Sequence, residues 1–227
     1  MAEDIPHWTY DGKYGPQNWG NLSDAYTFCK TGKFQSPIDI RNTMSATLPP
    51  LQLKFHTTAE QVVNNGHTIQ ITVNDEDDFL LDDDNFKLKQ YHFHSPSENT
   101  INGKQYPLEV HFVHSNEKGD LAVLAVMFET GKENSTLNTI LDNLPTHINQ
   151  RILISEQRDL KKLFPVDNHY YRFSGSLTTP PCTEGIRWLV MKNSVTLSTE
   201  QLAKIQSALK YSNNRPVQPI NGRVVVE

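Results

Sequence analysis

The sequence predicts a mainly β protein that forms one domain, with short helices in a minor role. Three observations support this prediction: most periodic segments alternate apolar and polar residues as strands do, the helical signals are short, and no linker or break in composition divides the 227 residues. A chain of this length can bury about 70% of the surface that it exposes when unfolded, which is enough for a substantial core.

The first fifty residues show little periodicity and are rich in proline, glycine, asparagine and aromatic residues, so we expect an irregular segment that wraps the surface. Strands are predicted after it wherever apolar and polar residues alternate or an apolar run is bounded by turn residues. In chain order the predicted strands are 61–63, 68–73, 86–93, 108–114, 121–128, 170–174, 186–191 and 223–226. Lys118-Gly119-Asp120 predicts a hairpin turn between two of them.

Two helices are predicted from their start and stop signals. Residues 134–144 begin at Asn134-Ser135 and stop before Pro145. Residues 199–209 follow Ser198, which is a good N-cap residue. Acidic residues at 75–78 and 82–84 surround a short apolar run; a calcium site is conceivable, but the EF-hand spacing is absent and a solvated hairpin tip is the simpler interpretation.

Composition excludes several classes of protein. The net charge of −5 argues against a general nucleic-acid-binding surface, and no apolar run approaches the roughly 20 residues of a membrane-spanning helix. The first residues lack the basic and apolar regions of a secretory signal. Cys29 and Cys182 are either two free buried thiols or one disulfide closing a loop of roughly 150 residues, and two cysteines alone do not decide between these.

A candidate metal site lies on two predicted strands. Alternation places His92 and His94 on one face of the first strand, and places Glu109 and His111 together on one face of the second. If the strands are neighbours, three imidazoles converge; three neutral imidazoles suit Zn²⁺ and leave its fourth position open, as in catalytic sites. Ordinary packing is the alternative, because a His-x-His pair alone is a weak signal.

Glu109 could accept a hydrogen bond from a ligand histidine, and we expect that histidine to lie on the adjacent strand. An inward carboxylate paired with a basic group is the alternative. His114 points to the other face and is more simply a structural histidine.

Segments in an order that spans nearly the whole chain match one known family. They are His7-Trp8-Thr9-Tyr10, Trp19-Gly20, Gln35-Ser36-Pro37-Ile38-Asp39-Ile40, Asn64-Asn65-Gly66-His67, Gln90-Tyr91-His92-Phe93-His94, Ser95-Pro96-Ser97-Glu98-Asn99, Glu109-Val110-His111, Gly175-Ser176-Leu177-Thr178-Thr179-Pro180-Pro181-Cys182 and Asn214-Arg215-Pro216. The chain thus resembles the α-class carbonic anhydrases, and the bacterial periplasmic kind more than the animal cytosolic kind. The resemblance implies one domain over 1–227, built on a large, twisted, mostly antiparallel sheet with short peripheral helices.

The same resemblance implies the function, which is the reversible hydration of carbon dioxide to bicarbonate by a zinc-bound hydroxide, with side esterase activity. It assigns the metal to His92, His94 and His111, and makes Gln90 and Glu109 partners of the ligands. It implies that Thr178 accepts a hydrogen bond from the hydroxide and donates one to Glu98, and that His67 carries protons. The substrate pocket would contain Val113, Val123, Leu177, Thr179 and Trp188, and cavity water would be ordered by Tyr10, Asn65 and Gln70.

From the residues alone, each of these assignments has a plainer alternative. Thr178 could be a turn residue before two prolines, His67 could simply follow an Asn-Gly turn, and most of the apolar residues could be ordinary core.

The resemblance further implies a Cys29–Cys182 disulfide, a periplasmic or secreted location and a homodimer. Two rival functions remain open from the sequence. One is a non-catalytic binding module on the same fold. The other is an unrelated zinc hydrolase, although no His-Glu-x-x-His helix or nucleophile elbow is present.

Overall fold

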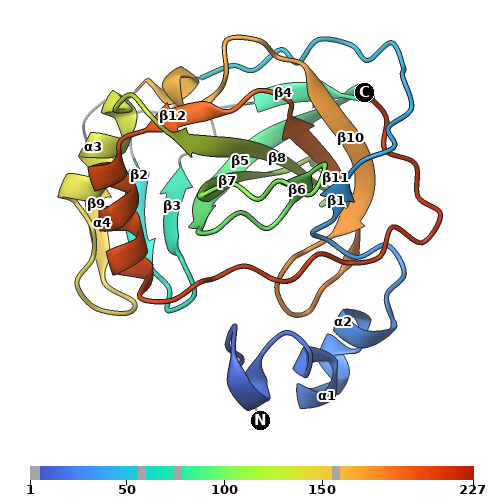
Figure 1. Cartoon of the computed structure of the whole chain (residues 1–227), viewed down its shortest axis with the longest axis horizontal. Helices are drawn as coiled ribbons and strands as arrows, with labels where there is room; N and C mark the ends of the chain where they lie inside the picture. The colour runs from blue at the N-terminus through green and yellow to red at the C-terminus, as the bar shows by residue number, and fades with distance from the viewer. Residues whose placement is uncertain (1–5, 56–59, 74–77, 155–158) are drawn as a thin grey trace.

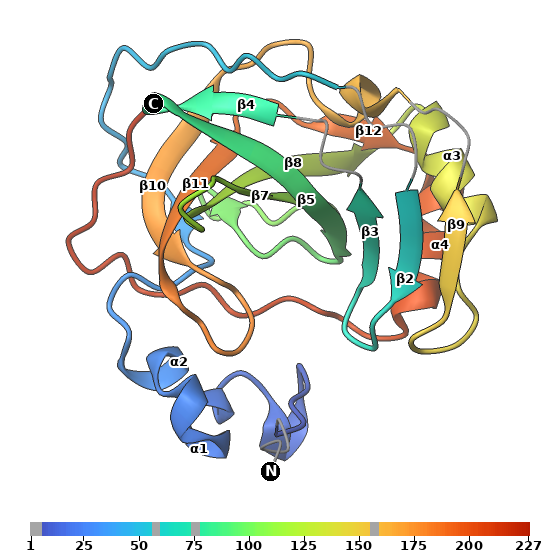
Figure 2. The same cartoon turned by 180° about the vertical axis from the view of Figure 1, so that it is seen from behind.

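In the computed structural model, which describes residues 6–55, 60–73, 78–154 and 159–227, most strands join one large twisted sheet (Figures 1 and 2). Along the sheet the order is β10 (Tyr170–Ser176), β11 (Glu184–Met191), β8 (Leu121–Thr130), β7 (Leu108–Ser115), β5 (Asp84–His94), β3 (Ile69–Val73), β2 (Glu60–Asn64) and β9 (Arg151–Ile154). Strand β12 (Val195–Leu197) pairs with β8, and β4 (Asp78–Leu81) pairs with β5.

The pairing within this sheet is mostly antiparallel, as expected; among its described strands, the parallel pairs are β8 with β11 and β8 with β12. A second, two-stranded parallel sheet joins β1 (Asp39–Ile40) to β6 (Thr100–Ile101). The prediction of a mainly β fold with a large, mostly antiparallel sheet is therefore confirmed.

Helices α3 (Ser135–Asp142) and α4 (Thr199–Leu209) lie together at the β2–β9 end of the sheet (Figures 1 and 2). The predicted N-caps form: Asn134 accepts from the backbone N–H of Thr136 at 3.1 Å, and Ser198 accepts from Gln201 at 3.2 Å in a capping box. Helix α3 ends two residues before the predicted 144, because the residue preceding a proline is disfavoured in helical conformation.

The first fifty residues are largely irregular but contain the short helices α1 (Trp19–Leu22) and α2 (Phe28–Thr31), which lie below the sheet (Figure 1). Single 3-10 turns form at Gly12–Tyr14, Asp24–Tyr26 and Leu160–Leu163. Among the helices in the described part of the chain, none has the length and hydropathy needed to cross a bilayer.

The strand predicted at 223–226 is wrong. Val226 forms isolated bridges to Met44 and to Arg172, and Val225 gives its carbonyl to Met44 instead of continuing a ladder. The segment therefore pairs with two different partners one residue at a time. Strands β9 and β12 were not predicted, because three or four residues carry too little periodicity to be recognised.

The acidic hairpin is confirmed where the structure describes it. Asp82 and Asp83 form the β4–β5 turn with positive φ angles of 51° and 64°, and Asp82 pairs with Arg172 on β10, 2.8 Å from Nη1 to Oδ1. Residues 75–77 of the predicted acidic cluster lie outside the described residues.

Two apolar clusters lie on opposite faces of the sheet, since alternate residues of β8 belong to different clusters. Leu124 and Val126 join the larger cluster, which also takes in α3 and α4, whereas Val123 and Ala125 join the smaller one with Trp188. Each large apolar side chain buried in this way contributes about 1.5–3 kcal/mol.

The expected disulfide is present. Cys29 and Cys182 are bonded across a sequence separation of 153 residues, so the bond ties the irregular N-terminal segment to the loop after β10. On the chain-entropy account a loop of this length stabilises the fold by about 5 kcal/mol.

His114 is buried in the larger cluster's face of β7, as expected for a structural histidine. Its Nδ1 lies 2.9 Å from the carbonyl oxygen of Phe112, and its ring meets Phe79 edge-on at 4.7 Å. Burial lowers the pKa of His114 to about 3, and hydrogen bonds with the backbone of Phe112 and Ala122 act against this effect.

This lowered pKa predicts an acid-dependent loss of stability. Below pH 6.5 His114 takes up a proton in the unfolded chain but stays neutral in the folded one. The stability that the neutral, buried His114 contributes is therefore fully present above pH 6.5 and is lost as the pH falls toward 3. Between pH 7 and pH 5 wild type should lose about 2 kcal/mol more than His114→Asn. Urea unfolding at both pH values measures this, with exposed His169→Asn as control; equal losses in wild type and His114→Asn would contradict it.

Candidate metal centre

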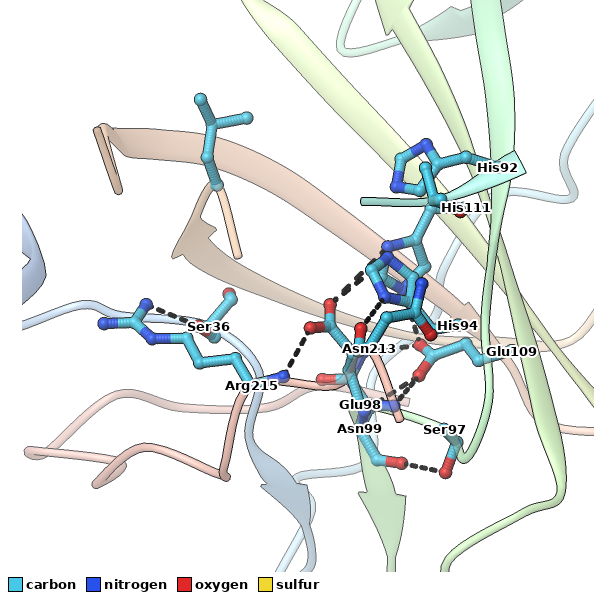
Figure 3. Close-up of polar contacts among 12 residues, drawn as sticks. Ser36, His92, His94, Ser97, Glu98, Asn99, Glu109, His111, Asn213 and Arg215 are labelled. Atoms are coloured by element: carbon cyan, nitrogen blue, oxygen red, sulfur yellow. Dashed lines mark hydrogen bonds and ion pairs between the residues drawn. The ribbon is translucent and has the colours of Figure 1, made fainter. Parts of the chain in front are cut away.

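Strand pairing brings the three predicted ligands together. His92 on β5 lies directly opposite His111 on β7, and His94 lies opposite Glu109. The three rings gather at one place with Glu98 and Glu109 beside them (Figure 3). One nitrogen from each histidine lies within 4.8 Å of the other two, so the three can bind one metal ion.

A β-bulge in β5 sets which face the histidines occupy. Leu88 pairs with His114 and Gln90 pairs with Val113, so two residues of β5 advance the register by one residue of β7. Leu88 therefore joins the same apolar cluster as Tyr91 and Phe93, three and five residues later, and His92 and His94 point to the opposite face. Unbroken alternation from Phe86 would have buried the histidines in the larger cluster.

Each histidine has its outer ring nitrogen held by the protein. His92 Nδ1 lies 2.7 Å from Oε1 of Gln90, and His94 Nδ1 lies 2.7 Å from the backbone carbonyl of Asn213. His111 uses the other nitrogen: its Nε2 lies 2.9 Å from Oε1 of Glu109. These partners fix the tautomers and leave Nε2, Nε2 and Nδ1, respectively, to face the common point.

Glu109 contacts a ligand on its own strand, not on the adjacent one as expected. The two residues share a face, and the His111 ring turns its Nε2 back toward the carboxylate. Glu109 is fully buried and is held by three donors: the backbone N–H groups of Glu98 and Asn99 at 2.7 and 2.8 Å, and the Asn99 side chain at 2.7 Å.

The site keeps its histidines uncharged. Burial lowers the pKa of His92 and of His111 well below the usual value, with the neighbouring rings adding to the effect. Burial also lowers the pKa of His94, against its bond to the Asn213 carbonyl and the charge of Glu109. Neutral imidazoles are the form that binds a metal.

The donor set fits a divalent transition metal. His94 Nε2 is buried without a hydrogen-bond partner among the described residues, although unpartnered buried polar atoms are costly. A cation at the common point would satisfy this atom together with its two neighbours. Three imidazole nitrogens are suitable ligands for Zn²⁺ and leave its fourth position open.

Glu98 lies next to the ligands and is fully buried. Its Oε2 is 3.5 Å from Nε2 of His94, while its Oε1 accepts from the backbone N–H of Arg215 at 2.8 Å. Burial raises the pKa of Glu98 well above the usual value; the Arg215 bond and a hydrogen bond from the Thr178 side chain act against this. The predicted pairing of Thr178 with Glu98 stays a prediction, which this effect of Thr178 on the pKa of Glu98 supports.

An apolar wall borders the metal point. Val113 and Val123 face each other across β7 and β8, and Trp188 lies opposite Val123 on β11. The Trp188 ring meets the His111 ring edge-on at 4.9 Å. Leu177 packs against the same cluster, and half-buried Thr179 lies in the same loop.

His67 lies in the turn before β3, and its ring stacks on Trp8 with centroids 3.7 Å apart. Burial lowers the pKa of His67, and nearby His7 adds to the effect. The Asn65 side chain donates to Gln70 at 3.4 Å, and Gln70 lies opposite His92. Tyr10 lies close enough to Glu98 that this charge adds to the burial that raises the pKa of Tyr10.

Known proteins share this sequence and fold. A sequence profile described as eukaryotic-type carbonic anhydrase matches residues 14–227. Carbonic anhydrases of Pectobacterium atrosepticum and Klebsiella pneumoniae are each 48% identical over 225 and 223 residues, which cover 99% and 97% of this chain and 92% and 91% of theirs. The chain belongs to the α-carbonic anhydrase family. An α-carbonic anhydrase of Thermovibrio ammonificans, solved with the inhibitor sulfanilamide, has a TM-score of 0.96 at 46% identity over 99% of this chain and 100% of that one.

Family membership gives this carbonic anhydrase its reaction, the reversible hydration of carbon dioxide to bicarbonate, and makes it a lyase. The interpretation drawn from the matching sequence segments is confirmed, and the unrelated zinc hydrolase is excluded.

Two contributors to the carbonic anhydrase site escaped the sequence analysis. Asn213 supplies the carbonyl for His94 and lies 119 residues from it in sequence, and Asn99 holds Glu109. Arg215 was noted within a matching segment, but not its backbone bond to Glu98. A backbone carbonyl or N–H leaves no mark in residue type, so no sequence pattern could have identified these contacts. The Asn99 side chain could have been suspected, since it lies next to Glu98 in a matching segment.

Glu109→Gln should weaken metal binding. Both carboxylate oxygens of Glu109 accept hydrogen bonds, whereas a glutamine has one oxygen that accepts and one NH₂ that donates. The NH₂ would therefore face another donor, either His111 Nε2 or the N–H groups of Glu98 and Asn99. We expect Zn²⁺ affinity to fall about 10- to 100-fold in competition with a chelator, as for other partners of metal-bound histidines. Exposed Glu117→Gln is the matched control; unchanged affinity in Glu109→Gln would contradict the role.

Proposed function

We propose that His92, His94 and His111 bind Zn²⁺ and that the surrounding side chains direct carbon dioxide hydration at it. The supporting observation is the set of three buried, uncharged rings whose outer nitrogens are all held by protein groups. Zn²⁺ so bound supplies a Lewis acid that brings the pKa of a water molecule to about 7, a value established for carbonic anhydrases as a class.

Thr178 and Glu98 orient the attacking oxygen. A hydroxyl has one hydrogen, and the lowering effect of Thr178 on the pKa of Glu98 supports its donation to that carboxylate. Thr178 then has only lone pairs to offer, so the attacking oxygen must donate its own hydrogen to Thr178. This leaves the lone pair of that oxygen free to point toward the apolar wall.

The wall formed by Val113, Val123 and Trp188, with Leu177, holds the substrate. Carbon dioxide has neither net charge nor dipole, so apolar side chains bind it without competing for the attacking oxygen. Thr179 would lie at the polar side of this pocket. The same attacking oxygen could hydrolyse small activated esters.

His67 carries the proton released in each turnover to the outside. Its pKa is lowered from an ordinary value near neutrality, so its neutral ring can take up a proton and readily release it to buffer. Tyr10, Asn65 and Gln70 would order the water that connects His67 to the metal point. Stacking on Trp8 restrains the orientation of the ring.

The Cys29–Cys182 bond supports an oxidising compartment, and we propose a periplasmic or secreted location. We further propose a homodimer, as for similar bacterial enzymes. A non-catalytic binding module, the alternative function, is disfavoured because the three ligands, Glu98 and Thr178 are all present together in the site.

His94→Ala tests the zinc proposal. Removing one of three ligands should reduce bound Zn²⁺ from one per chain to a small fraction and abolish nearly all stopped-flow hydration activity. His169→Ala removes an exposed histidine and serves as control. Full activity in zinc-free His94→Ala protein would refute the proposal, and so would wild-type protein that contains no zinc and keeps its activity in excess chelator.

His67→Ala tests the proton-transfer proposal. Hydration should slow several-fold in dilute buffer, where the release of protons limits turnover, and added imidazole should restore it, because a free imidazole can replace the missing ring. Zinc content should stay at one per chain. A variant as fast as wild type in dilute buffer, or a slow one that imidazole does not restore, would contradict the role.

A further inference from the structure

Asn213 is a fully buried polar residue in the segment that follows α4 and that runs below the strands in Figure 1. Figure 3 shows it beside the ring of His94. Its backbone carbonyl binds that ring, but its side chain makes three further hydrogen bonds that the proposed mechanism does not use.

These bonds join three separate parts of the site. Oδ1 accepts from the backbone N–H of Ser95 at 2.9 Å, and Nδ2 donates to the carbonyl of Phe93 at 2.8 Å, so the amide holds both neighbours of His94. Nδ2 also donates to the carbonyl of His67 at 3.1 Å. The two hydrogens of Nδ2 thus connect the turn that carries His67 to the strand end that carries His94.

Only an amide meets these requirements. The position needs one acceptor facing Ser95 and two donors facing carbonyls; aspartate lacks the donors, and serine is too short to make three bonds. In a site without exposure each lost partner leaves a buried polar group unsatisfied. The Thr68 hydroxyl also donates to Phe93 at 2.6 Å, but it contacts neither Ser95 nor the carbonyl of His67 among the described contacts.

We propose that Asn213 is a positioning residue whose side-chain amide fixes His94 and His67 relative to each other. A single amide thereby controls both metal retention and proton transfer. The inference rests on the proposed roles of these two histidines. It goes beyond them because it couples two steps that the separate ligand and proton-carrier assignments treat as independent.

The experiment uses the full-length zinc enzyme with Asn213→Ser and Asn213→Asp. Serine keeps the backbone carbonyl for His94 but loses all three side-chain bonds; aspartate keeps the acceptor for Ser95 and places oxygen against two carbonyls. Two quantities are measured below the unfolding temperature: the rate of Zn²⁺ release to a chelator, and hydration turnover in dilute buffer with and without imidazole. Carbon dioxide–bicarbonate exchange at equilibrium isolates the chemical step from proton transfer.

We expect Zn²⁺ release to quicken about 10-fold or more in both variants, in line with other residues that orient metal-bound histidines. Turnover in dilute buffer should fall several-fold beyond any change in exchange, and imidazole should restore it. His67→Ala should lower only turnover in dilute buffer, with zinc release as in wild type.

The matched control is Asn134→Ala. Asn134 is also a buried asparagine whose amide links two segments, donating to the carbonyl of Lys162 at 2.8 Å, but it caps α3 away from the metal point. It should lower the unfolding temperature and leave zinc release and buffer dependence as in wild type, which separates positioning from loss of stability.

A change in only one of the two quantities, or in neither, overturns the coupling while the proposed function stands. If wild-type protein binds no zinc, or if its hydration turnover does not depend on buffer concentration, the proposed function and this inference are both overturned. Should one Asn213 variant fail to fold, the other decides.

Discussion

Three uncharged imidazoles can stay buried at the centre of a sheet only because the outer nitrogen of each has a fixed partner. An unpartnered ring nitrogen in the interior would cost about 1–3 kcal/mol and could rotate away from the common point. Gln90 and Glu109 each lie two residues before the histidine that they contact, on the same strand, whereas Asn213 lies in a segment far away in sequence. The rest of the site is arranged to keep these partners in place.

Keeping these partners in place requires buried carboxylates, and the fold supplies the hydrogen-bond donors that stabilise them. Glu109 would be unfavourable in its position without the three donors from Glu98 and Asn99. Glu98 is held in turn by Arg215, whose guanidinium binds the carbonyls of Ser36 and Cys29. A continuous set of contacts therefore runs from His111 through two carboxylates and an arginine to the disulfide-bonded N-terminal segment.

The irregular N-terminal segment is connected to the site at two places, so it contributes to the structure of the site although it has little regular secondary structure. At one end Trp8 stacks on His67, and at the other Cys29 is bonded to Cys182 in the loop that also carries Thr178. Covalent attachment to a rigid sheet compensates for the few regular hydrogen bonds that such a segment makes by itself.

The sequence by itself determined the elements and the chemical groups of the site. Alternation identified most strands, capping residues located both longer helices, and histidines two apart on neighbouring strands indicated the metal site, because these features depend on residue type and local period. Tertiary structure decided which nitrogen of each ring faces the common point and which histidine Glu109 contacts. It also decided which face the bulge at Lys89 assigns to His92, and which distant backbone groups complete the site. These depend on contacts between backbone groups far apart in the chain, whose hydrogen-bonding capacity is the same for nearly every residue type.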